Sequence, residues 1–392
     1  MGEINLPAAC SPDLRAQVAA LAEAAARHPG EASPALELGN ALYQAAAREE
    51  AITWWEKATK LDRDNPTLWR NLGIAYFNVF HDVEAAKGAY LRAFRLALQA
   101  GSVSGETARA LYERDQLWKR TRERPDARLM ELEKYPELVQ QRDDLTIEYA
   151  ALHNQSTHYA KALEILRSRR FVPWGGGDRP ILTQWTRANI ALGREALWRS
   201  AGSGGDPRRA LEHFESVLTP PENLGETWPP QSNQGEAHYW AGLAARATGT
   251  PEAAQRHLLA AAETVGDSPQ EVALPYSDGF YWACLALQEL GRPKDARRHF
   301  EAMLAFSQTL KNAPAKTLSP LTSLSASPPF DEDPQARQTE SSLLLEALAR
   351  HGLNGEDGAD RKTARRLLHD LLRDNPSHQL AADLLVALDW AP

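Results

Sequence analysis

Three polar residues, Asn40, Arg70 and Asn71, have side chains that could bind a ligand together. An arginine offers a planar fork that holds a carboxylate through two hydrogen bonds, and an asparagine adds further donors. A clamp for the carboxylate of a peptide usually needs another basic residue on the next equivalent helix, where Arg114 stands between two acids. The alternative is that the three side chains hydrogen-bond neighbouring helices to one another, and both interpretations remain open.

A second polar group is formed by Arg142 and Asp143, which are followed by Asp144. Acids at the start of a helix accept hydrogen bonds from free backbone N–H groups and interact favourably with the helix dipole. The other interpretation is a polar docking site for a partner. Paired carboxylates can also act as general acid and base. Adjacent residues at a helix start point in different directions, so we do not expect catalysis here.

Trp174 is followed directly by three glycines in an irregular segment that covers residues 170–180. An aromatic side chain on such a loop can stack on a ring or fill a pocket on a partner. It can equally fold back and fill a gap where the regular pattern is interrupted, and both interpretations stay open. A glycine-rich loop alone is weak evidence for phosphate binding, and no strand is expected before this one.

Motifs for catalysis or metal binding are not found in the sequence. It contains neither a Gly-x-Ser-x-Gly nucleophile motif nor a phosphate-binding P-loop. The 11 histidines are scattered, and no pair of them on one helix has a cysteine or an acid at metal-ligand spacing. We therefore predict no catalytic residue, no metal and no cofactor.

Small residues recur at fixed intervals and define the elements that must position these side chains. Gly39 is followed by alanines at intervals of 12 and 7 residues, Gly73 by alanines at 13 and 7, and the two glycines lie 34 residues apart. The pattern returns in two later sets: Gly242, Ala254, Ala261 and Cys284, Ala296, Met303. A period near 34 residues with small residues at these places is typical of the tetratricopeptide (TPR) repeat.

The spacing has a physical reason. Two helices approach to an interaxial distance of about 8–10 Å, and the closest approaches require small side chains at the crossing. Gly39 and Gly73 leave this space on the first helix of a pair. Large residues near the middle of the second helix, such as Trp54, Trp55 and Tyr90, fill the neighbouring gaps. First helices line the inner face of such an array, which commonly binds extended peptides. The three polar residues named at the start belong to first helices.

The prediction for the fold is therefore an all-α, right-handed superhelical solenoid of TPR-type antiparallel helix pairs. Val and Ile are sparse and rarely alternate, so no sheet is expected. Helix pairs are predicted at about 34–61, 66–99, 105–134, 143–169, 180–218, 235–264 and 277–310. The expected parts are a lead segment and helix (1–33), the array (34–310) with irregular loops at 170–180 and 219–234, a Pro/Ser-rich loop (311–334) and a C-terminal helical cap (335–392).

Composition and charge argue against several other classes of protein. The 392 residues are 43% hydrophobic and 24% charged, as in folded proteins. The net charge of −8, with both signs interspersed, disfavours a nucleic-acid partner. No apolar run approaches the roughly 18 residues of a membrane span, and the N-terminus does not read as a signal peptide. The lack of such a run means that no membrane partner is expected. With only two cysteines, a disulfide framework is not expected, and a cytoplasmic location fits.

Two loop motifs are more specific than the repeats: Arg170-Phe171-Val172-Pro173-Trp174-Gly175-Gly176 and Glu222-Asn223-Leu224-Gly225-Glu226. With Arg142-Asp143-Asp144-Leu145 and Phe330-Asp331-Glu332-Asp333, they resemble the TPR region of large bacterial proteins of unassigned function. In those proteins a β-rich domain similar to carbohydrate-active enzymes precedes the repeats. The candidate partner-binding residues are then Asn40, Arg70, Asn71, Arg142, Asp143, Arg170, Trp174, Asn223 and Glu226.

The sequence also departs from this family. Gly175 stands where the family usually carries an acid, and nothing in the 392 residues resembles the β-rich domain. The chain is then expected to be a fragment or a stand-alone relative, and an activity of that domain does not transfer to it. The leading prediction is a non-catalytic scaffold that binds a protein or peptide partner, or a β-rich domain of the same protein. The alternative is an accessory module of a carbohydrate-active enzyme.

Overall fold

The computed structural model describes residues 6–7, 10–101, 104–173, 179–198, 205–228, 234–263, 276–315, 329–354 and 358–390. In these ranges the regular elements are α-helices and one short 3-10 helix, with no strand, which confirms the predicted all-α fold. The chain divides into two compact units. Unit 1 comprises Met1–Thr121, Lys134–Leu145 and Leu324–Asp331, and unit 2 comprises Arg122–Glu133, Thr146–Ser323 and Glu332–Pro392.

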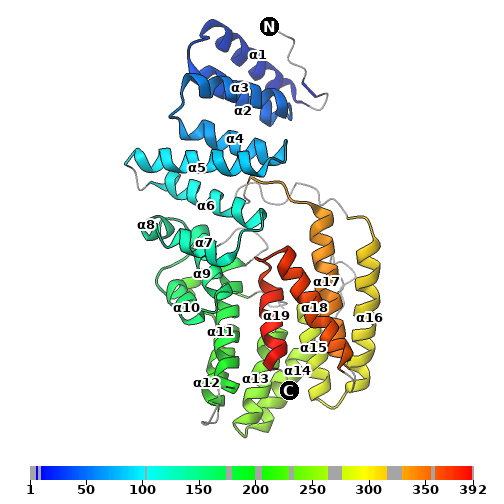
Figure 1. The fold of residues 1–392 in the computed structure, drawn as a ribbon. Helices are drawn as coiled ribbons and strands as arrows, with labels where there is room; N and C mark the ends of the chain where they lie inside the picture. The colour runs from blue at the N-terminus through cyan, green and yellow to red at the C-terminus, as the bar shows by residue number, and fades with distance from the viewer. Residues whose placement is uncertain are drawn as a thin grey trace. The chain divides into compact units, whose positions relative to one another are not determined.

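Unit 1 is a stack in which each helix packs on the next one along the chain (Figure 1). Its helices are α1 (Pro12–Arg27), α2 (Ala32–Gln44), α3 (Arg48–Leu61), α4 (Pro66–Asn78), α5 (Val83–Gln99), α6 (Gly105–Arg120) and the single turn α8 (Pro136–Val139). The pairs α2/α3 and α4/α5 make the most extensive contacts of this unit, as expected for the two helices of one repeat.

In unit 2 as well, helices that are consecutive in sequence pack on one another. Its helices are α7 (Pro125–Leu132), α10 (Tyr159–Arg167), α11 (Pro180–Trp198), α12 (Pro207–Leu218), α13 (Gly235–Ala247), α14 (Pro251–Ala262), α15 (Asp278–Glu289), α16 (Pro293–Asn312), α17 (Pro334–Leu353), α18 (Ala359–Asp374) and α19 (Gln379–Trp390), with the 3-10 helix η1 (Glu222–Leu224). The boundary between the units falls inside α9 (Asp143–Gln155). Alternate helices α11, α13, α15 and α17 also contact one another, and the last helix, α19, packs against α11.

The helices begin where the sequence supplies caps. The side chains of Ser11, Asn65 and Asp82 accept hydrogen bonds from backbone N–H groups in the first turns of α1, α4 and α5. Such caps satisfy donors that have no partner inside the helix. Proline stands in the first turn of α1, α4 and many helices of unit 2, where its missing N–H costs nothing. Local sequence therefore accounts for most of the helix starts.

The predicted close packing at glycines is found in the structure. A Cβ atom on Gly39 would lie 2.4 Å from the Trp55 ring, and one on Gly73 would lie 2.5 Å from the Tyr90 ring. A Cβ atom on Gly242 would lie 2.8 Å from Leu258. Each of these glycines lies on the first helix of its pair and leaves room for a large side chain of the second. The small residues allow the helices to approach, as the spacing predicts.

The structure also contains features that the spacing did not predict. Gly193 on α11 makes the same kind of room for Phe214 on α12, and Gly352 on α17 makes room for Phe300 on α16. The first of these pairs escapes the pattern because residues between α11 and α12 lengthen the interval. The turn α8 lies between two predicted helix pairs, and Pro136 begins it.

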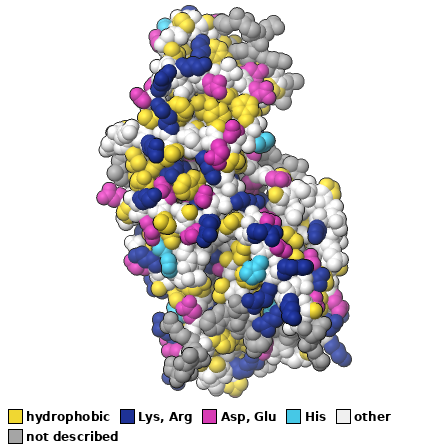
Figure 2. Space-filling model, viewed as in Figure 1, with side chains coloured by type: hydrophobic (Ala, Val, Ile, Leu, Met, Phe, Trp, Pro, Cys, Tyr) yellow, Lys and Arg dark blue, Asp and Glu magenta, His cyan; other side chains and the backbone are white. Residues whose placement is uncertain are grey.

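Charged side chains of both signs are interspersed on the face of the molecule seen in Figure 2. Within the described ranges, no helix combines the length and the apolar character that crossing a membrane requires.

Candidate functional site

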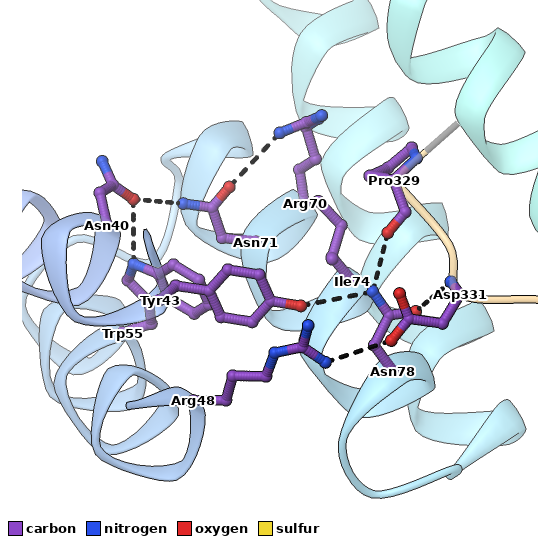
Figure 3. Close-up of a pocket in the computed structure, with 10 residues that line it drawn as sticks. All are labelled: Asn40, Tyr43, Arg48, Trp55, Arg70, Asn71, Ile74, Asn78, Pro329 and Asp331. Carbon is purple, nitrogen blue, oxygen red and sulfur yellow. Dashed lines mark hydrogen bonds and ion pairs between the residues drawn. The ribbon is translucent and has the colours of Figure 1, made fainter. Parts of the chain in front are cut away.

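A hollow of about 410 Å³ opens on the face of unit 1 that carries α2 and α4, and we call it the first-helix groove (Figure 3). Its lining comes from α2, α3, α4 and a short segment that is remote in sequence: Asn40, Tyr43, Arg48, Trp55, Arg70, Asn71, Ile74, Asn78, Pro329 and Asp331. The predicted candidates Asn40, Arg70 and Asn71 are thus brought together at one site.

Asn40 and Asn71 join two repeats through their side chains. The Asn40 Oδ1 atom accepts hydrogen bonds from Trp55 Nε1 at 3.2 Å and from Asn71 Nδ2 at 2.8 Å. Trp55 is also the ring that fills the space above Gly39. The same amide oxygen therefore links α2 to α3 and also links this helix pair to α4. Figure 3 draws both hydrogen bonds of Asn40, one to Trp55 and one to Asn71.

Arg70 already holds a carboxylate of this chain. Its Nη2 atom donates to Glu113 Oε1 on α6 at 2.6 Å, and Nε donates to the other carboxylate oxygen. Burial lowers the pKa of Arg70, but the hydrogen bond and charge of Glu113 outweigh this effect, so the pKa is raised. Glu113 also accepts from Tyr90 Oη at 3.3 Å and from Arg109. The Arg70 fork connects first helices of successive repeats.

The segment of residues 329–331 binds to α4 through Asn78. The Asn78 Nδ2 atom donates to the Pro329 carbonyl oxygen at 2.8 Å, and Asn78 Oδ1 accepts from the Asp331 backbone N–H at 3.0 Å. Tyr43 Oη accepts from the same Nδ2 atom at 3.3 Å. Asn78 is 9% exposed, and both its amide nitrogen and its amide oxygen have hydrogen-bond partners within the groove.

Arg48 provides the positive charge on the open side of the groove. Its Nη1 atom donates to Asp331 Oδ2 at 3.1 Å, and its guanidinium lies over the Tyr43 ring at 5.5 Å. Both partners of the ion pair are more than a third exposed, at 43% and 60%. The pair therefore remains accessible to solvent and to a ligand.

Sequence reasoning missed Tyr43, Arg48 and Asn78. A signal for Asn78 was present, because it lies two helical turns after Asn71 and so shares its face of α4. No local signal connects Pro329 to α4, since the contact spans 251 residues of sequence.

Arg142 and Asp143 lie outside the first-helix groove. Arg142 pairs with Asp144, with Nε to Oδ1 at 3.0 Å and Nη2 to Oδ2 at 2.6 Å, and it lies over the Tyr112 ring. The hydrogen bond that Arg142 donates to Asp144 is the main reason why the pKa of Arg142 is raised. Asp143 and Asp144 stand in the first turn of α9, where acids interact favourably with the helix dipole.

Asn223 connects the two irregular loops of unit 2. Its Nδ2 atom donates to the carbonyl oxygens of Leu166 at 2.9 Å and Arg169 at 2.8 Å, at the end of α10. Its own carbonyl oxygen accepts from the Phe171 backbone N–H at 2.8 Å. Asn223 therefore holds the residues after α10 against η1. Its side chain supports the packing of the chain and does not line the first-helix groove.

Glu226 caps the start of α11 from within the protein. Its Oε2 atom accepts from the Leu182 backbone N–H at 3.1 Å, the residue is 5% exposed, and burial raises the pKa of its carboxyl group. Arg170 has an exposed side chain. Trp174 lies outside the described residues. None of the described loop candidates, Arg170, Asn223 and Glu226, lines the first-helix groove.

A second hollow, of about 700 Å³, lies in unit 2 and is lined in part by His153, His158 and His213. Burial lowers the pKa of His153 to about 4, and its ring nitrogens make no hydrogen bond to a described residue. Among the described residues no three histidine, cysteine or acidic side chains are placed to share a metal ion.

Comparison with known proteins identifies the repeat. The TPR repeat family matches residues 39–79. This stretch of the chain therefore matches one TPR repeat. Because the match includes α3 and α4, this repeat supplies most of the lining of the first-helix groove.

Several solved structures are similar to the chain at low identity. A MamA protein is 17% identical, with 49% of this chain and 89% of that chain covered and a TM-score of 0.32. A TPR protein from Parabacteroides merdae is 17% identical, with 70% and 93% covered and a TM-score of 0.35. A chain of the Naa15/Naa10 complex bound to HypK-THB is 14% identical, with 97% and 53% covered and a TM-score of 0.41.

Proposed function

We propose that this protein is a non-catalytic, cytoplasmic scaffold that binds a protein partner through the first-helix groove of unit 1. The observation that supports this proposal is the composition of the hollow. It combines amides, arginines and aromatic rings from consecutive TPR helices around open space of about 410 Å³. Tyr, Trp and Arg are the residue types that contribute most to protein interfaces, since they offer large contact areas and directed hydrogen bonds.

Arg48 is the residue with which to test this function. Its side chain is 43% exposed at the rim of the groove, so Arg48→Glu reverses a charge there without disturbing the core. Arg95 on α5 is a matched control, because it is also an exposed arginine of unit 1 and does not line the groove. We expect a partner captured by the wild-type chain and by Arg95→Glu to be lost with Arg48→Glu.

The measurement is affinity capture from a cell extract with the three tagged chains, followed by direct binding of the purified partner. A partner that binds all three chains equally well would place the interaction elsewhere and contradict the proposal. The accessory role beside a carbohydrate-active enzyme has no comparable observation behind it, because Trp174 lies outside the described residues and Asn223 packs against its own chain.

A further inference from the structure

Residues 329–331 contact the first-helix groove in the way a bound peptide contacts its receptor. They come from the sequence between α16 and α17 and cluster with unit 1. Three kinds of contact hold them: hydrogen bonds to the backbone, a buried aromatic side chain and an ion pair. Each kind selects a different property of a ligand.

The backbone contact comes from Asn78. One amide side chain binds the carbonyl oxygen of residue 329 and the N–H group of residue 331, which fixes the residue between them in register (Figure 3). Such bonds are independent of the side chains of the bound segment. Asn78 therefore recognises polypeptide as such, and the neighbouring contacts must provide specificity.

The aromatic contact is made by Phe330, which is 5% exposed. Its ring meets Phe77 edge-on with centroids 5.3 Å apart, meets Tyr90 at 5.5 Å, and lies beneath the Arg120 guanidinium at 5.7 Å. Aliphatic side chains complete this pocket: Ile74, Ala86 and Leu117. A flat aromatic ring can pack against aromatic neighbours and interact with a cation through its face at the same time.

The ionic contact joins Asp331 to Arg48. An exposed pair of this kind contributes little affinity, but it selects the sign of the charge on the bound segment. The part of the hollow that remains open beside Pro329 and Asp331 is lined by Asn40, Arg70 and Asn71. A longer ligand can therefore continue along α2 and α4 past the position of the resident segment.

We infer that the first-helix groove, together with the adjoining pocket of Phe330, binds a partner segment in which an aromatic residue is followed by a carboxylate. Residues 329–331 are then a resident mimic that such a segment displaces. The inference rests on the proposed function and names the chemistry of its ligand. Because the mimic is tethered, its effective concentration is high, and it reduces the apparent affinity for a partner in proportion to its occupancy.

The test uses the 392-residue chain and a fluorescent peptide with the sequence of residues 325–335, Ser-Ala-Ser-Pro-Pro-Phe-Asp-Glu-Asp-Pro-Gln. Fluorescence anisotropy compares its binding to wild type and to the double variant Phe330→Ala/Asp331→Ala, in which the resident contacts are removed. We expect the double variant to bind the peptide more tightly, on the order of tenfold, because the tethered competitor is gone. A control peptide with alanine in place of the phenylalanine should not bind.

A second variant is needed, because removal of a buried phenylalanine can unfold the repeat. Asp331→Arg changes a side chain that is 60% exposed and places it against Arg48, so the fold is retained while the resident segment is weakened. It should also bind the peptide more tightly than wild type. Circular dichroism checks that both variants keep their helices. Folded variants that bind the phenylalanine and alanine peptides equally, or not at all, would overturn the inference and make residues 329–331 a structural strap.

The result is separable from the test of the proposed function. If Arg48→Glu loses a cellular partner but no folded variant binds the peptide, the groove is an interaction site and only the ligand chemistry is wrong. If the peptide binds and Asn78→Ala in the Asp331→Arg background abolishes binding, the ligand chemistry holds whether or not a cellular partner was captured.

Discussion

At the scale of single residues, Gly73 and Gly88 present opposite surroundings. A Cβ atom on Gly73 would lie 2.5 Å from the Tyr90 ring, whereas one on Gly88 of α5 would meet nothing within 4 Å. We expect Gly73→Ala to destabilise the protein by about 1–3 kcal/mol, since a buried ring must move. Gly88→Ala should instead stabilise it by up to about 1 kcal/mol, because alanine favours the helix. Urea unfolding midpoints measure both effects, and equal shifts in the same direction would refute this packing.

The two cysteines are expected to differ in reactivity. Cys284 is 0% exposed, and burial raises the pKa of its thiol to about 12, so the reactive thiolate is strongly disfavoured at neutral pH. Cys10 is partly exposed. We expect a thiol reagent at pH 7 to modify Cys10 in the folded protein and both cysteines in denaturant. Peptide mass spectrometry locates the label. Rapid labelling of Cys284 in the native state would contradict its burial on α15.

At the scale of elements, Asn223 is predicted to support the end of α10. Asn223→Ala removes two hydrogen bonds to partly buried carbonyl groups, at a cost of about 1–3 kcal/mol. Glu222→Ala, one residue earlier with an exposed side chain, is the control and should have little effect. Hydrogen exchange at residues 168–171 should accelerate in the first variant alone. Unchanged exchange there would mean that the loop is held by other contacts.

Individual helices were predictable because their signals are local. Caps such as Asn65 and first-turn prolines such as Pro66 lie within a few residues of the backbone groups that they affect. The single turn α8 was not predictable, because four residues carry no periodic pattern. The interval from Gly193 to Phe214 was not recognised either, since the insertion between α11 and α12 changes the spacing on which the repeat pattern depends.

At the scale of the whole molecule, buried titratable groups determine how stability depends on pH. Burial is the main cause of a pKa lowered to about 4 in His153, His238 and His351, against about 6.5 in an unfolded chain. The unfolded state then binds more protons below pH 6.5, and stability falls as the pH drops from 6.5 towards 4. Glu236 acts in the opposite sense. Burial raises the pKa of its carboxyl group to about 7, so the folded state binds more protons than the unfolded state between about pH 4.5 and 7. The free energy of unfolding therefore falls as the pH rises through this range.

Among the described residues, seven histidines have a lowered pKa, whereas three carboxyl groups have a raised one, so we expect the melting temperature to be lower at pH 5 than at pH 7. The variant Glu236→Gln removes one of the opposing groups and should make this difference larger. Thermal unfolding followed by circular dichroism, in buffers of equal ionic strength, measures both. A melting temperature that rises on acidification would show that these histidines are not buried in the neutral form.

The sequence by itself determined the helical class, the approximate helix pairs and the packing of Gly39 and Gly73 against large rings. These features depend on residues that are near one another in the chain and recur with a fixed period. Sequence also placed Asn40, Arg70 and Asn71 on one face. Only the tertiary structure decided what that face contacts: Arg70 is paired with Glu113, and Asn78 holds a segment 251 residues away. Such contacts join residues that are far apart in the chain, which no local spacing encodes.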